Sequence, residues 1–166
     1  SLDAMGARGE LIRAGTDWDV IEENRRRMIE ECPDVYFEIT PTVSIMNVYH
    51  LPDFHKEWID KGLLEPQNVR MNILTYPTEY RIQIIPPKER KKFVDKYEKH
   101  IKWIGDNFGD GAAKRGFESV LDFLQQENYE NLVPDFIDRN TPLDKLRGES
   151  LYQVAPELEF FRDYEY

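Results

Sequence analysis

Strand-like and helix-like segments alternate along the first 86 residues of this 166-residue chain. β-Branched and aromatic residues are concentrated in residues 35–46 and 69–76, whereas residues 17–31 and 52–61 have the pattern of helices. Residues 1–4 resemble the last part of another strand, since strands usually have about 5–6 residues. Because strands that alternate with helices are joined by crossovers, this order predicts a parallel sheet.

The pattern changes after Pro86. Residues 88–107 and 114–127 carry apolar stripes at helical spacing, residues 134–146 are expected to be helical, and an apolar tail follows. We therefore expect an α/β fold with two parts. Residues 1–86 would form a partial parallel (β/α) barrel that contains only the later strands, and residues 87–166 a mostly helical C-terminal extension that shares its core.

Composition limits the class of protein. Hydrophobic residues make up 40% of the chain, which indicates a folded protein. No apolar run approaches the roughly 20 residues of a membrane span. The single cysteine, Cys32, excludes an internal disulfide framework and favours a cytoplasmic location.

The net charge of −10 is concentrated near the C-terminus, where residues 117–166 hold 12 acidic and 4 basic side chains. An acidic surface repels phosphates, so nucleic-acid binding is disfavoured. The basic side chains at the start of residues 88–107 alternate with acidic ones, which is typical of a solvated helix face.

Short motifs occur in a particular order along the chain. They are Ser1-Leu2-Asp3-Ala4 with Gly6, Ile12-Arg13, Trp18 through Asn24, Thr42-Val43-Ser44 with Asn47, Asn72 and Pro77, Leu143-Asp144-Lys145 with Arg147, and Pro156-Glu157-Leu158. In this order they resemble radical S-adenosylmethionine (radical SAM) enzymes, in the branch that contains a twitch domain. The resemblance covers most of the chain, although each separate motif is short.

The resemblance implies five residues that bind the cosubstrate. Ser1 and Asp3 would lie near its ribose and amino acid, and Arg13 would pair with its carboxylate. A guanidinium is suited to this role because it binds a carboxylate through two parallel hydrogen bonds. Asn47 and Asn72 would add hydrogen bonds. Each of the five also has a plain structural interpretation, as a turn residue or a surface charge.

The chain departs from the radical SAM pattern in its cysteines. The family holds a 4Fe–4S cluster with three closely spaced thiolates, and one cysteine cannot supply them. The cluster would therefore belong only to a full-length parent. S-Adenosylmethionine would bind weakly or not at all to this fragment, and Cys32 is expected to be a small buried residue.

The resemblance thus implies the C-terminal fragment of a radical SAM enzyme, which supplies part of the S-adenosylmethionine pocket and a substrate-side extension and is inactive alone. The parent would be the enzyme, and no catalytic residue is assigned in this chain. Two other hypotheses are a non-catalytic α/β interaction module with an acidic C-terminal region and a domain that binds a nucleoside-type ligand.

Three further expectations concern histidines and assembly. His50, Asp53 and His55 are close in sequence but poorly spaced for a metal, so no metal site is assigned. His100 is expected to be exposed. An uncovered sheet edge or inner face, including alternating members of Val35, Phe37 and Ile39, predicts a homo-oligomer.

Overall fold

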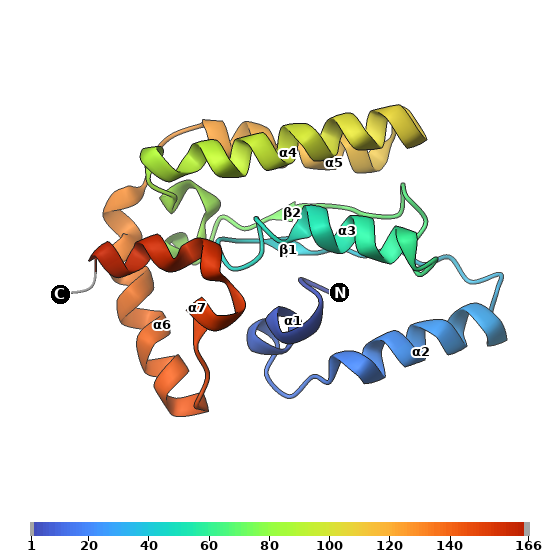
Figure 1. Ribbon diagram of the computed structural model, residues 1–166, viewed down its shortest axis with the longest axis horizontal. Coiled ribbons are helices and arrows are strands. Elements are labelled where there is room, and N and C mark those ends of the chain that lie inside the picture. Colours follow the sequence, from blue (N-terminus) through green and yellow to red (C-terminus); the bar gives the residue numbers. More distant parts are fainter. Residues whose placement is uncertain (1, 165–166) are drawn as a thin grey trace.

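The computed structural model describes residues 2–164. Helices form most of the molecule and surround a short pair of strands (Figure 1). Helices α4 and α5 run side by side along one long edge, α1 and α2 lie along the opposite edge, and α6 and α7 close one end (Figure 1).

Seven α-helices and four short 3₁₀ segments are found in residues 2–164. The α-helices are α1 (Gly6–Ile12), α2 (Trp18–Glu31), α3 (Leu51–Asp60), α4 (Pro87–Phe108), α5 (Ala112–Gln125), α6 (Val133–Arg147) and α7 (Leu151–Val154). The 3₁₀ segments are η1 (Thr78–Tyr80), η2 (Ile82–Ile84), η3 (Glu130–Leu132) and η4 (Pro156–Tyr164). Within the described part of the chain, no helix has both the length and the apolar character that a bilayer crossing requires.

The sheet is much smaller than the sequence predicts. It contains only β1 (Thr42–Val43) and β2 (Asn72–Ile73), which pair in parallel, and a parallel bridge joins Ile39 to Val69. The predicted α/β class and the partial (β/α) barrel are therefore wrong, because the described chain is mostly helical. The parallel direction of the two strands agrees with the helix that connects them.

Two features limit the size of the sheet. Pro41 has no N–H group and so interrupts the ladder between the Ile39 bridge and β1. On the other side of β1, the Thr42 N–H donates to the Asp3 carboxylate at 2.8 Å. The backbone group that would pair with a third strand is thus bonded to a side chain instead.

Helix α1 begins only three residues after Asp3. Gly9 allows this helix to approach the preceding backbone. A Cβ atom at Gly9 would lie 2.6 Å from the carbonyl oxygen of Ala4. Any larger residue would therefore push α1 away from residues 2–4.

The other predicted helices are confirmed with small changes at their ends. Asp17 caps α2 by accepting a hydrogen bond from Val20 N at 3.2 Å. Helix α4 ends at Gly109, whose φ of 75° suits glycine. Helix α6 continues through Pro142.

One hydrophobic core joins the first 86 residues to the helices that follow. Phe54 and Trp58 of α3 are fully buried, as are Phe93 and Tyr97 of α4. The Tyr97 hydroxyl donates to the carbonyl oxygen of Val48 at 2.7 Å, which ties α4 to the loop after β1. The two predicted parts thus share a core, and the boundary between them at residue 86 stays a prediction.

Candidate functional site

A cavity of about 280 Å³ lies at the carboxyl ends of the two strands. Ser44 and Met46 follow β1, Leu74 follows β2, and all three line the cavity. In sheets of parallel strands this edge is where ligands usually bind, because loops there present side chains beyond the sheet. The cavity is therefore the first candidate for a binding site.

The lining combines polar groups with an apolar wall. Its polar residues come from four separate segments, and they are Asp3, Thr42, Ser44, Tyr80, Asn140 and Arg147. The apolar wall consists of Leu11, Ile12, Met46, Leu74 and Leu143. Burial raises the pKa of Tyr80, so its hydroxyl keeps its proton at neutral pH. A ligand with both a ring and hydrogen-bonding groups suits this mixture.

Asp3 is the most buried charged residue of the lining, with 7% of its surface exposed. One carboxylate oxygen accepts the hydrogen bond from Thr42 N, and the other accepts one from Arg13 Nε at 2.7 Å. Arg13 is not among the residues that line the cavity. The structure thus brings Asp3 and Arg13 together, with only Asp3 at the cavity.

Asn47 is fully buried, and its side chain bonds to three backbone groups. Its Oδ1 accepts from Ser44 N at 2.8 Å. Its Nδ2 donates to the carbonyl oxygens of Asp3 and Thr42 at 2.8 and 2.9 Å. The side chain therefore holds residues 2–4 against β1, and a ligand would reach it only by displacing these bonds.

Asn72 is separate from the other predicted binding residues. It begins β2 and its side chain is exposed, outside the described lining of the cavity. Ser1 lies outside the described residues. Of the five predicted positions, the structure thus gathers Asp3, Arg13 and Asn47 at the end of β1.

Two cavity residues of helix α6 were not predicted. Asn140 and Arg147 are seven residues apart and so lie on the same face, about two turns from each other. Arg147 Nη1 donates to the carbonyl oxygen of Leu11 at 3.2 Å, which links the end of α6 to α1. A signal for Arg147 existed, since it belongs to one of the motifs that carry the resemblance. Ser44 was part of another.

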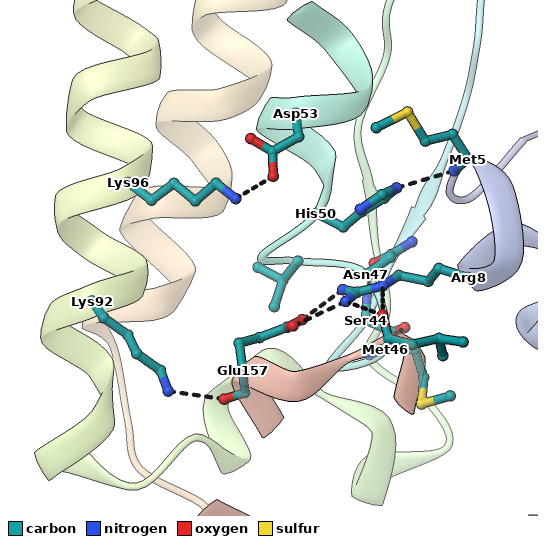
Figure 2. Close-up of polar contacts among 12 residues, drawn as sticks. Met5, Arg8, Ser44, Met46, Asn47, His50, Asp53, Lys92, Lys96 and Glu157 are labelled. Carbon is teal, nitrogen blue, oxygen red and sulfur yellow. Dashed lines mark hydrogen bonds and ion pairs between the residues drawn. The ribbon is translucent and has the colours of Figure 1, made fainter. Parts of the chain in front are cut away.

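A second polar cluster joins α1, α4 and the C-terminal segment and is shown in Figure 2. Arg8 and Glu157 are both less than 10% exposed and form a buried ion pair, with Nη2 and Oε2 2.9 Å apart. Arg8 also donates to the carbonyl oxygen of Val154 at 2.7 Å. Lys92 of α4 donates to the Glu157 carbonyl oxygen at 2.8 Å. These bonds fasten the C-terminal segment to α1 and α4.

His50 holds the start of α1 in this cluster. Its Nε2 accepts a hydrogen bond from Met5 N at 3.2 Å, so the ring is neutral and carries its proton on Nδ1 (Figure 2). Burial, followed by the positive charge of Arg8, lowers the pKa of His50 to about 4. Protonation would remove the acceptor for Met5 N.

His55 and His100 form a buried pair between α3 and α4, so the prediction of an exposed His100 is wrong. His55 Nε2 lies 2.9 Å from the carbonyl oxygen of Pro66 and must donate to it. His55 Nδ1 therefore accepts from His100 Nε2, which is 3.0 Å away. Burial lowers the pKa of His55 to about 4 and, with the charges of His55, Lys96 and Lys56, that of His100 to about 3.

The histidines do not form a metal centre in the described residues, where no group of three or more potential ligands occurs. His55 turns towards His100 and away from His50, whereas Asp53 pairs with Lys96. Cys32 lies at the end of α2 and is exposed. The prediction that it is a buried apolar residue is wrong.

Comparisons with known proteins add no relative. No protein-family model matches the chain, and no similar curated protein or solved structure was found.

Proposed function

We propose that this chain supplies part of the S-adenosylmethionine pocket of a radical SAM enzyme, and that the pocket is the cavity at the ends of β1 and β2. The observation that carries the proposal is the position of Asp3. This residue of the Ser1–Ala4 motif lines the cavity and is paired with Arg13, the other principal residue that the resemblance implies.

The chemistry of the lining supports this ligand. Each Asp3 carboxylate oxygen accepts one hydrogen bond, from Thr42 N or from Arg13 Nε. Each oxygen has a second lone pair that can accept a hydrogen bond from a ribose hydroxyl. Leu11, Leu74 and Tyr80 offer an apolar wall for a purine ring. The volume of about 280 Å³ is just below the range of about 300–1,000 Å³ for ligand pockets, so the cavity would enclose only part of the cosubstrate.

The radical chemistry itself would need thiolates from outside these 166 residues. When bound, a 4Fe–4S cluster supplies the electron that cleaves S-adenosylmethionine. The exposed Cys32 is the only thiol of the chain and three are needed. Asp3 and Arg13 would position the cosubstrate, and the apolar wall would exclude water from it.

This requirement gives a direct prediction about iron. Anaerobic reconstitution of the chain with iron and sulfide is expected to leave less than one cluster per protein, measured by iron content and visible absorption. A stoichiometric cluster, retained after gel filtration, would contradict the ligand count.

Titration calorimetry with S-adenosylmethionine tests the pocket. We expect weak binding that Asp3→Asn and Arg13→Ala each reduce, because both change the same ion pair. Ser119→Ala, on the exposed face of α5, is the matched control and is expected to bind like the original chain. Tight binding that ignores both pocket substitutions would contradict the assignment. Absence of binding would favour the hypothesis of an interaction module.

We also propose that the protein is cytoplasmic, binds no nucleic acid and self-associates. The single cysteine supports a cytoplasmic location, and the net charge of −10 supports the absence of nucleic-acid binding. Exposed apolar side chains near the end of α2 and after it support self-association, among them Val35 and Tyr36.

A further inference from the structure

Three arginines lie near the cavity and differ in how their charges are balanced. Arg13 is 2.7 Å from the Asp3 carboxylate, and Arg139 forms a close ion pair with Glu79. Arg147 lies farther from its ion-pair partner Glu149, with Nη1 and Oε2 3.9 Å apart. Because this distance is too long for a hydrogen bond, the charge of Arg147 is the least compensated of the three.

Arg147 is also the arginine that lines the cavity. Its Nη1 donates a hydrogen bond to the carbonyl oxygen of Leu11, and its side chain is 37% exposed. A guanidinium has five N–H donors in a planar fork that matches a carboxylate. The group is thus held at the cavity by one bond while its charge faces a space that a ligand can enter.

Asn140 lies on the same wall and is only 8% exposed. The hydrogen bond from its Nδ2 to Oδ1 of Asp144 is long at 3.4 Å. The other Asp144 oxygen accepts from Leu151 N at 2.8 Å, so Asp144 is fixed by the start of α7. A well-placed acceptor in the cavity would give the Asn140 amide a better bond than its present one.

We propose that Arg147 and Asn140 bind the carboxylate of a small molecule in this cavity. A carboxylate fits better than a phosphate, because the cavity already contains the negative Asp3 and offers one weakly compensated positive charge. Asp3, which also lines the cavity, would accept hydrogen bonds from amine or hydroxyl groups of the same molecule. This inference deepens the proposed function and rests on it only for the identity of the ligand.

The carboxylate has two possible sources that share this chemistry. It is either the amino-acid carboxylate of S-adenosylmethionine or a carboxylate of a separate substrate. In the first case Arg147 would bind the carboxylate while Arg13 holds Asp3 in place, and in the second α6 would be the substrate side of the pocket.

A titration with succinate, followed by NMR of the ¹⁵N-labelled chain, tests the carboxylate site without S-adenosylmethionine. Succinamide is the neutral probe of nearly the same shape. We expect succinate, and not succinamide, to shift the Arg147 Nε–H signal and backbone signals of the cavity to saturation. Arg147→Gln should weaken this binding at least about tenfold, because it removes a charge-assisted hydrogen-bond donor.

Arg139→Gln is the matched control, since Arg139 lies on the same helix but is paired with Glu79. It should leave succinate binding unchanged. Arg147→Lys keeps the charge and should bind with intermediate strength, which separates loss of the site from loss of folding. Equal shifts with succinamide, no saturable shift with succinate, or equal weakening by Arg139→Gln would each overturn the proposal.

Two nucleosides distinguish the sources. If the carboxylate is that of S-adenosylmethionine, Arg147→Gln weakens S-adenosylmethionine and leaves methylthioadenosine, which lacks the amino acid, unchanged. If it belongs to a substrate, the same variant loses succinate and leaves both nucleosides unchanged. Succinate binding that depends on Arg147 in a chain that binds neither nucleoside would support this inference and contradict the proposed function.

Discussion

The carboxamide of Asn47 makes three hydrogen bonds with backbone groups and is fully buried. Such a residue resembles a binding residue in sequence, because the same donor and acceptor would suit a ligand. Here both ends of the amide connect residues 2–4 to the end of β1. Its effect on the cavity is therefore indirect, through the position of Asp3.

Asn47 and Asn72 provide a matched pair for testing this difference. Asn47→Ala should lower the free energy of unfolding by about 2–3 kcal/mol, because it leaves buried backbone groups without partners. Asn72→Ala, at an exposed position, should change it by less than about 0.5 kcal/mol. Urea denaturation of both variants measures the difference, and equal effects would contradict the structural role of Asn47.

The three histidines make stability depend on pH. Burial lowers the pKa values of His50 and His55 to about 4 and that of His100 to about 3, so the folded state favours the neutral rings. Their contribution is complete above the unfolded pKa of about 6.5 and is lost as pH falls from there towards the folded values. Each histidine adds a slope of up to about 1.4 kcal/mol per pH unit.

We therefore expect the free energy of unfolding to fall between pH 6.5 and pH 5, measured by urea denaturation at several pH values. Carboxylates contribute little in this window because most of them titrate below it. His100→Gln, which can still donate to His55 Nδ1, should make the slope smaller. If the free energy of unfolding stays constant across this window, folding does not lower the pKa values of these histidines.

At the scale of elements, the C-terminal segment η4 connects α1 and α4 through polar contacts. Glu157, near its start, forms the buried pair with Arg8 of α1, and its carbonyl oxygen is bonded to Lys92 of α4 (Figure 2). Arg8 also bonds to Val154 at the end of α7. Elements separated by about 150 residues thus depend on one ion pair.

Glu157→Gln should destabilise the protein by about 3 kcal/mol, because it leaves the buried Arg8 charge without its partner. Hydrogen exchange is expected to increase first in α1 and η4. Asp95→Asn, which breaks an exposed pair with Lys91, is the control and should cost less than about 1 kcal/mol. Similar losses for the two variants would contradict the importance of burial at Glu157.

At the scale of the whole molecule, the predicted exposed sheet face is largely covered. Ile39 is 2% exposed and Val43 is fully buried, whereas Val35 and Tyr36 are 52% and 69% exposed. The apolar surface that remains thus lies before the strands and beside the end of α2, where Ile29 is also partly exposed.

Self-association is still expected, through this remaining apolar surface. Light scattering during size-exclusion chromatography should give a mass that increases with concentration towards a dimer. Tyr36→Ser should shift the protein towards monomer, and Tyr76→Ser, which changes an exposed tyrosine elsewhere, should not. A monomer at every concentration would show that the surface has no partner in a second copy.

Local signals predicted the helices well. The Asp17 cap, the glycine after α4 and the apolar stripes of α4 and α5 depend on residues close in sequence, so the sequence alone indicates them. The extent of the sheet depends on pairing between distant segments. The missing N–H group of Pro41 follows from the sequence, but the bond from Thr42 N to Asp3 joins residues 39 positions apart. No local pattern shows such a bond.

The same distinction applies to the candidate site. The resemblance proposed Asp3 and Arg13 as binding residues from motifs near the N-terminus, and the sequence determined that the chain has too few thiols for a cluster. Only the tertiary structure placed Arg147 and Asp3 in the lining of one cavity, bonded Asn47 to backbone groups and buried His100 against His55. Burial and charge compensation arise between segments far apart in the chain, so they are decided when those segments pack together.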